Sequence, residues 1–215
     1  MRKSSGNGNK ARLTSVVCVL VLLFSVATPA TAQRGRDKWQ QPERVMEDLN
    51  LEPGDKVADV GCGRGYFTFR LARAVGKKGQ VVAVDINERS VRSVRQRAER
   101  EDMKQVEAHE SAPADAKLPA GQMDAALLCL VLHHASDDVR QPLVKSIARG
   151  LKPGGYLFVL DFRKVKNPRF HSYEQLVGRE KVIQFAKEAG LSLDAEYLYL
   201  KEEYFLRFRK PEKEE

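Results

Sequence analysis

The chain has 215 residues, of which 42% are hydrophobic and 31% are charged. This length and composition are those of one globular domain, and they exclude a disordered chain. The formal net charge is +8, but residues 1–32 hold four basic residues and no acidic one, so the remainder has 33 of the 37 basic residues against 29 acidic ones. Such a small excess is a weak basis for binding nucleic acid.

The chain has too few cysteines for a disulfide framework, and their spacing is not that of a zinc site. We therefore expect no bound metal. The three cysteines are Cys18, Cys62 and Cys129.

The first 32 residues have the layout of an export signal. No charge lies between Arg12 and Arg34, and a short apolar run follows a basic segment. Ala30 and Ala32 are the small residues that a signal peptidase accepts, so we expect cleavage after Ala32 and a periplasmic or secreted protein. Two alternatives stay open. One is a membrane anchor formed by residues 13–32, with membrane contact in that case alone, and the other is a misassigned start in a cytosolic protein.

From Lys56 onward, short β-branched runs alternate with longer amphipathic stretches. This alternation is typical of βαβ units, so we predict an α/β domain with a mostly parallel, doubly wound sheet over residues 51–209. The last two strands are separated by two residues and must be antiparallel. Strands are predicted at residues 56–60, 80–85, 105–108, 124–130, 156–161, 193–200 and 203–209. Helices are predicted at residues 65–75, 88–100, 137–150 and 172–189.

Two flanking segments and two glycines complete this prediction. Residues 33–50 form an N-terminal helical segment with an amphipathic helix at residues 39–49. Residues 210–215 are charged with nothing to bury, so we expect a disordered tail. Gly150 and Gly190 are expected to end their helices in the left-handed conformation.

A glycine loop follows the first predicted strand, where the chain reads Asp59-Val-Gly61-Cys-Gly63-Arg-Gly65-Tyr66. Glycines at this place let the backbone turn tightly against a ligand. A dinucleotide fingerprint requires glycine where this chain has Tyr66, and Asp59 would repel a pyrophosphate. The loop therefore favours a zwitterionic or cationic ligand and argues against an NAD-dependent oxidoreductase.

The second predicted strand ends in Asp85, about twenty residues beyond the loop, where a carboxylate can bind both hydroxyls of a ribose. A nucleoside that carries an amino-acid tail satisfies both Asp59 and Asp85. The alternative role for Asp85 is to cap the next helix.

These motifs resemble those of the class I S-adenosylmethionine-dependent methyltransferases. The resemblance covers residues 39–209, including segments 114–116, 123–134 and 151–161. It implies a Rossmann-like sheet with strand order 3-2-1-4-5-7-6, the last strand antiparallel, and S-adenosylmethionine as the cofactor. The C-terminal half resembles small ubiquinone/menaquinone-methyltransferase-like members.

The resemblance also implies roles for the residues of the cofactor site. Asp59 would hold the ammonium group of the methionine portion, and Asp85 the ribose. The glycine loop would line the methionine portion with Gly61, Cys62, Gly63 and Gly65. The adenine and the ammonium group would be contacted further by Ile86, Asp115, Ala116 and the Cys129 carbonyl.

Three histidines are candidates on the acceptor side. His133 and His134 follow the fourth strand and are candidates to orient or deprotonate an acceptor. His171, in the loop after the fifth strand, is either a substrate contact or a surface histidine. Many relatives use no dedicated base, because alignment of the acceptor with the cofactor suffices.

We therefore predict a methyltransferase that acts on a small-molecule acceptor. The alternative is an exported module that binds S-adenosylmethionine or a nucleoside without catalysis. No nucleic-acid partner is expected, because acids interrupt the arginines of residues 88–100 and no aromatic residues accompany them. Cys62 and Cys129 lie on strands expected to be neighbours, and a reduced pair is favoured over a disulfide.

Overall fold

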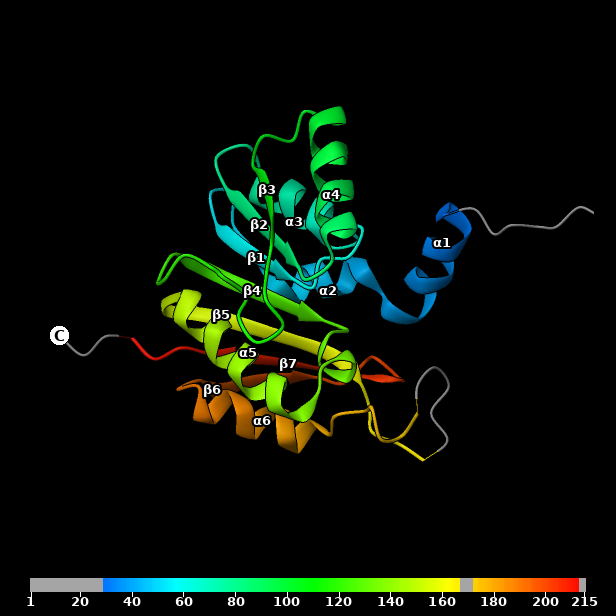
Figure 1. Ribbon diagram of the computed structural model, residues 1–215, viewed down its shortest axis with the longest axis vertical. Helices are drawn as coiled ribbons and strands as arrows, with labels where there is room; N and C mark the ends of the chain where they lie inside the picture. The colour runs from blue at the N-terminus through cyan, green and yellow to red at the C-terminus, as the bar shows by residue number, and fades with distance from the viewer. Residues whose placement is uncertain (1–28, 167–171, 213–215) are drawn as a thin grey trace, which may run out of the picture.

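The computed structural model describes residues 29–166 and 172–212, and it contains the predicted sheet (Figure 1). The strand order is β3-β2-β1-β4-β5-β7-β6, and β7 is antiparallel to both of its neighbours. This confirms the predicted fold class. The strands are β1 (Lys56–Val60), β2 (Gln80–Asp85), β3 (Val106–Glu110), β4 (Met123–Cys129), β5 (Leu151–Phe162), β6 (Ser192–Tyr197) and β7 (Glu203–Arg209).

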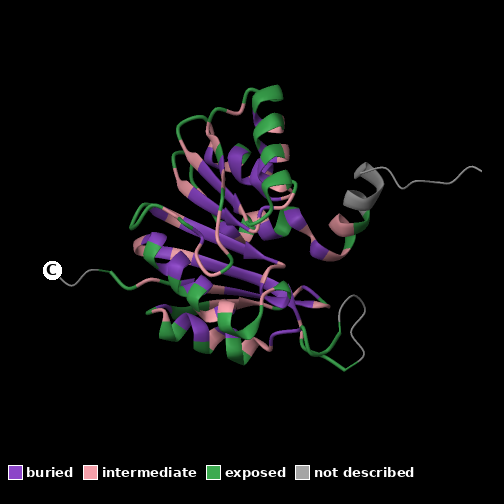
Figure 2. Ribbon diagram, in the orientation of Figure 1, coloured by how far each residue is buried: buried purple, intermediate pink, exposed green. Residues whose placement is uncertain are grey.

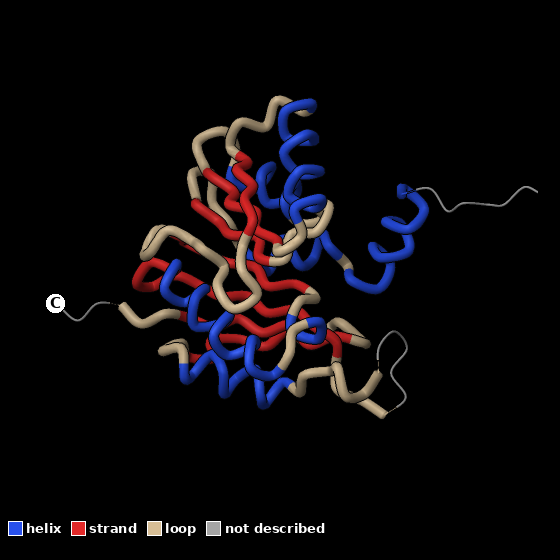
Figure 3. The backbone as a smooth tube through the Cα atoms, in the orientation of Figure 1, coloured by secondary structure: helices blue, strands red, loops and turns tan. Residues whose placement is uncertain are grey.

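Helices cover both faces of the sheet (Figure 3). One face packs against α5 and α6, and the other against α2, α3 and α4. Figure 2 shows the buried residues on the strands and on the helix faces turned toward them. The helices are α1 (Pro29–Gln40), α2 (Pro42–Leu49), α3 (Thr68–Val75), α4 (Glu88–Arg100), η1 (Leu132–His134), α5 (Asp137–Gly150) and α6 (Arg179–Glu188). Within the described ranges, no helix has both the length and the apolarity needed to span a bilayer.

The N-terminal segment differs from the single helix predicted at residues 39–49. It forms two helices that meet at Gln41, which has a left-handed φ of 48°. A residue that precedes proline avoids the right-handed helical region, so Pro42 begins a new helix. The predicted signal falls partly outside the described residues, and the predicted cleavage site after Ala32 lies within α1.

Two further predictions were wrong in detail. Gly150 has no positive φ, and it is glycine because a Cβ would lie 2.8 Å from Cβ of Leu118; Gly190 has the predicted left-handed φ of 80°. The ordered chain also extends beyond residue 209, since Nζ of Lys210 donates to the carbonyls of Ala148 and Leu151 at 2.8 and 2.7 Å. The ammonium group of Lys210 therefore binds backbone carbonyls of the domain, which the composition of the tail did not indicate.

The predicted helix at residues 172–189 is shorter, because α6 begins at Arg179, directly after Gly178. The strand β5 begins at Leu151, five residues before the predicted start. Both differences leave the sheet order and the C-terminal edge of the strands unchanged.

Candidate active site

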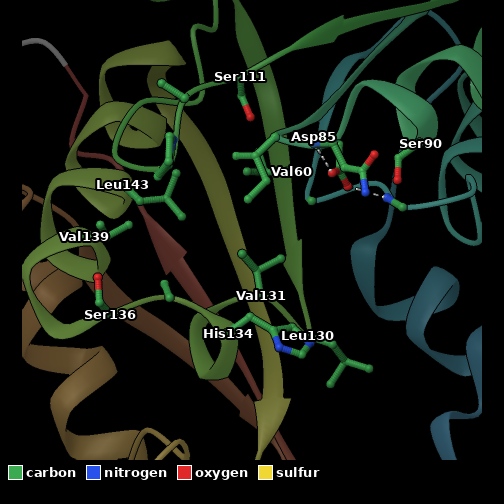
Figure 4. A pocket seen from close by; sticks show the side chains of 17 residues that line it. Val60, Asp85, Ser90, Ser111, Leu130, Val131, His134, Ser136, Val139 and Leu143 are labelled. Carbon is green, nitrogen blue, oxygen red and sulfur yellow. Dashed lines mark hydrogen bonds between the residues drawn. The ribbon is translucent and has the colours of Figure 1, made fainter.

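A cavity of about 630 Å³ opens at the C-terminal edge of the sheet (Figure 4). In open α/β sheets this edge is where ligands bind. The cavity is lined by the loop after β1, the end of β2, the loop after β3, the segment after β4 and the start of α5. The labelled lining residues are Val60, Asp85, Ser90, Ser111, Leu130, Val131, His134, Ser136, Val139 and Leu143.

Gly61 and Gly63 line this cavity, and each has a positive φ. A Cβ on Gly61 would lie 2.3 Å from Cγ2 of Val131, so no other residue fits there. A Cβ on Gly63 would meet nothing within 4 Å, which leaves its backbone open to a ligand.

The other two loop residues have structural surroundings. A Cβ on Gly65 would lie 2.4 Å from the ring of Phe69, so this glycine allows α3 to pack beneath the loop. Cys62 is buried, and burial raises the pKa of its thiol, which keeps it protonated and unreactive. Neither residue belongs to the cavity lining.

Asp85 connects the glycine loop to β2. Its Oδ2 accepts a hydrogen bond from the Gly63 amide at 2.8 Å, and its Oδ1 accepts one from the Asn87 amide at 2.8 Å (Figure 4). The cap of α4 is Asn87, whose side chain accepts from the Arg89 amide, so the capping alternative for Asp85 was wrong. Beside it, Ile86 is 60% exposed and lines the cavity.

Asp59 lies buried beneath the loop and outside the cavity lining. Its Oδ2 accepts a hydrogen bond from Oγ1 of Thr68 at 2.6 Å. Burial raises the pKa of Asp59 to about 6, although the hydrogen bond from Thr68 and the charge of Arg36 oppose this rise. A buried carboxylate at this place is stabilised by a cationic group.

Asp115 and Ala116 lie away from the cavity lining. Asp115 forms an ion pair with Arg149 at 3.5 Å, and the buried Ala116 amide donates to Oγ of Ser146 at 2.9 Å. The backbones of Ala112 and Asp115 are hydrogen-bonded in a tight bridge that turns the chain back.

The residues that line the cavity here are Ser111, Ala112 and Pro113. Sequence reasoning missed them. Their position directly after β3, at the C-terminal edge of the sheet, was the available signal.

The two adjacent histidines have different environments. His134 is exposed and lines the cavity. His133 is buried, with Nδ1 at 2.6 Å from Oδ1 of Asp161, and the two imidazole centroids are 4.0 Å apart. His133 and Asp161 therefore fix the short helix that presents His134. His171 lies outside the described residues.

The N-terminal helix contributes polar groups that sequence reasoning missed. Nε2 of Gln40 donates to Oε1 of Glu203 at 2.7 Å, and the guanidinium of Arg36 lies 3.8 Å from the ring centroid of Tyr66. Both Arg36 and Gln40 also lie 3.5 Å from Sγ of Cys129. Glu203 is fully buried, and burial raises its pKa to about 8.

Cys62 and Cys129 are both free thiols. Burial raises the pKa of Cys129 as well, so both stay protonated at neutral pH. The described residues contain no group of three or more His, Cys, Asp and Glu side chains suited to a metal ion.

Comparison with known proteins decides the family. A sequence model of a protein family, the methyltransferase domain, matches residues 57–155. The 2-phytyl-1,4-naphtoquinone methyltransferase of Trichormus variabilis is 31% identical over 159 residues, which cover 74% of this chain and 68% of that protein. The chain belongs to the class I S-adenosylmethionine-dependent methyltransferases.

Two further likenesses place this methyltransferase among its relatives. The demethylmenaquinone methyltransferase of Staphylococcus saprophyticus is 27% identical over 167 residues, covering 78% of this chain and 69% of that protein. A SAM dependent methyltransferase from Aquifex aeolicus superposes with a TM-score of 0.74 at 24% identity, covering 81% of this chain and 92% of that one.

The residues of the site fit S-adenosylmethionine, the cofactor of this family. Each carboxylate oxygen of Asp85 accepts one backbone hydrogen bond and has a further lone pair for a ribose hydroxyl. Ile86 offers an exposed apolar surface for adenine, and Asp59 offers a buried negative charge for the ammonium group. Gly63 has the space for close approach of the methionine portion.

We predict that Asp85→Ala weakens binding of S-adenosylhomocysteine by about 1–3 kcal/mol, because a charged acceptor is removed. Asp85→Asn retains one acceptor oxygen, so its loss should be smaller. Titration calorimetry measures both affinities, and Glu99→Ala, an exposed acid on α4, is the matched control. Unchanged affinity in both Asp85 variants would remove this residue from the site.

We also predict that ligand binding releases a proton from Asp59. With a pKa of about 6, the carboxyl is half protonated at that pH, and an ammonium group beside it favours the ionised form. Binding of S-adenosylhomocysteine at pH 6 should then release about half a proton per site. Calorimetry in two buffers of different ionisation enthalpy measures the release.

Asp59→Asn is the control for this prediction, and it should release no proton. Because burial raises the pKa of Asp59, the folded wild-type protein binds more protons than the unfolded chain between about pH 4 and pH 6. Its free energy of unfolding therefore falls as pH rises through this range. In Asp59→Asn no carboxyl ionises at this position, so the free energy of unfolding does not fall for this reason. This variant should therefore unfold at a higher denaturant concentration than the wild type at pH 7. Equal proton release by both proteins contradicts the assignment.

Proposed function

We propose that the chain methylates a small aromatic acceptor of the quinol type, with S-adenosylmethionine as the methyl donor. The observation that carries the proposal is that the glycine loop, Asp85 and His134 share one cavity. The substrate class follows the relatives, which are a 2-phytyl-1,4-naphtoquinone methyltransferase and a demethylmenaquinone methyltransferase.

The proposed roles divide the chemistry between backbone and side chains. The cofactor supplies a methyl group bound to a sulfonium sulfur. The leaving group is a neutral thioether, so it needs no proton. Gly61 and Gly63 position the methionine portion through the backbone, and Asp85 holds the ribose. His134 orients the acceptor and takes its proton, while His133 is a positioning residue that acts through η1.

The test is transfer of labelled methyl from S-adenosylmethionine to reduced naphthoquinones, followed by mass spectrometry. We expect His134→Ala to lower turnover by less than about a hundredfold with cofactor affinity intact, since alignment supplies most of the rate. Gly63→Val should abolish cofactor binding, because its side chain would fill the space the ligand needs.

A loss of more than about a thousandfold in His134→Ala would make this histidine an essential base. Cofactor binding without transfer to any acceptor would favour the alternative, a binding module without catalysis.

We further propose that the protein is exported and that the mature chain begins at Gln33. The support is the charge-free apolar run and the small residues Ala30 and Ala32. The residues of α1 that contact the domain, Arg36 and Gln40, would then remain in the mature protein. N-terminal sequencing of protein from the native host should read from Gln33, and a full-length cytosolic product would contradict export.

A further inference from the structure

Two segments form one continuous surface at the C-terminal edge of the sheet. They are residues 163–166, after β5, and residues 198–202, between β6 and β7. The Arg163 amide donates to the Glu202 carbonyl at 2.9 Å, and the Arg163 side chain donates to the Leu200 carbonyl at 3.4 Å. Lys164 lies 4.9 Å from the ring centroid of Tyr173. We call these two segments together with Tyr173 the mouth rim.

The mouth rim lies at the same edge of the sheet as the cavity. Phe162 at the end of β5 pairs with Glu203 at the start of β7, so both segments leave the sheet at its C-terminal edge. In Figure 1 they lie on the right, on the side where α1 is placed. Tyr199 of the rim contacts the start of α2, because Arg44 stacks on its ring at 3.9 Å.

Large apolar side chains of the mouth rim are exposed. Leu198 is 74% exposed, Val165 48% and Tyr173 44%. Among the described residues, the other large exposed apolar side chains are Ile86, which lines the cavity, and Leu193, on β6. Exposed apolar side chains gathered on one surface mark a surface that binds a partner.

The same surface is basic. The two segments hold four basic residues and one acid, Glu202. Exposed apolar side chains interspersed with lysines suit the interface of an anionic lipid bilayer, where the apolar groups enter the acyl boundary and the lysines meet the headgroups.

The position of the N-terminal helix agrees with a lipid partner. The described chain begins at Pro29, in a helix held at this edge by the contacts of Arg36 and Gln40. The residues that precede Pro29 include the charge-free apolar run, a sequence suited to lipid.

We propose that the mouth rim is a docking surface for an anionic membrane. The surface acts whether or not the N-terminal segment is retained. It is independent of the methyl acceptor, since it rests on the rim residues alone.

The test uses the full chain with vesicles of equal parts phosphatidylglycerol and phosphatidylcholine, and with vesicles of phosphatidylcholine alone. Hydrogen exchange is measured peptide by peptide, so rim contact is seen even where another segment also holds the protein on lipid. We expect slower exchange at residues 163–166 and 198–202 on the anionic vesicles. Exchange at these residues unchanged by vesicles would overturn the proposal.

Variants sharpen this test. Leu198→Asp should weaken rim-dependent vesicle binding about tenfold, and each of Lys164→Gln and Lys201→Gln, which removes one positive charge, about fivefold at low salt. Leu193→Asp, an exposed leucine outside the rim, is the matched control and should bind like the wild type. Thermal melting verifies that each variant is folded.

Two other outcomes contradict the proposal. One is an equal loss of vesicle binding in Leu193→Asp and Leu198→Asp. The other is rim protection that rises with protein concentration in the absence of vesicles, which would assign the surface to a second copy of the chain.

Discussion

A single methyl-sized volume limits the whole site. The space where a Cβ of residue 61 would lie is taken by the side chain of Val131, so this side chain of the segment after β4 packs directly on the backbone of the loop after β1. The Gly63 amide is in turn tied to Asp85 at the end of β2. Three neighbouring strand ends are thus held together by two short side chains, each in contact with the backbone of the glycine loop. Such a site is arranged before its ligand arrives, and little ordering is left to be done on binding.

The buried acids around this rigid part of the site are energetically unfavourable. Asp59 and Glu203 are buried acids with raised pKa, and Arg36 lowers the pKa of both. Desolvation of a carboxylate costs free energy that one partner seldom offsets. By the family resemblance, the cofactor would place its ammonium group beside Asp59. The buried charge of Asp59 therefore lowers the stability of the free protein and would raise its affinity for a cationic ligand.

The strands and the residues at their ends depend on local sequence pattern, and they could be predicted from the sequence. The β-branched runs identified the strands, and the glycine loop and Asp85 identified two strand ends that prove to share a cavity. Contacts between residues far apart in the chain could not be predicted in this way. Asp115 pairs with Arg149, and Lys210 is ordered by carbonyls about sixty residues earlier in the chain.

The same limit applies to the N-terminal helix and the histidines. Nothing near Gln40 in the sequence indicates that it meets Glu203, and nothing near His133 indicates Asp161. These partners are brought together by the order of the strands, which the residue pattern alone did not give and which came from the family resemblance.

The place of β7 in the sheet has a consequence for the synthesis of the protein. Residues 203–209 lie between β5 and β6, although they follow both strands in the chain. Until they emerge, the long edge of β5 has no neighbour, and an open edge is a site for pairing with other chains. A nascent or truncated chain that lacks β7 therefore exposes this edge to aggregation.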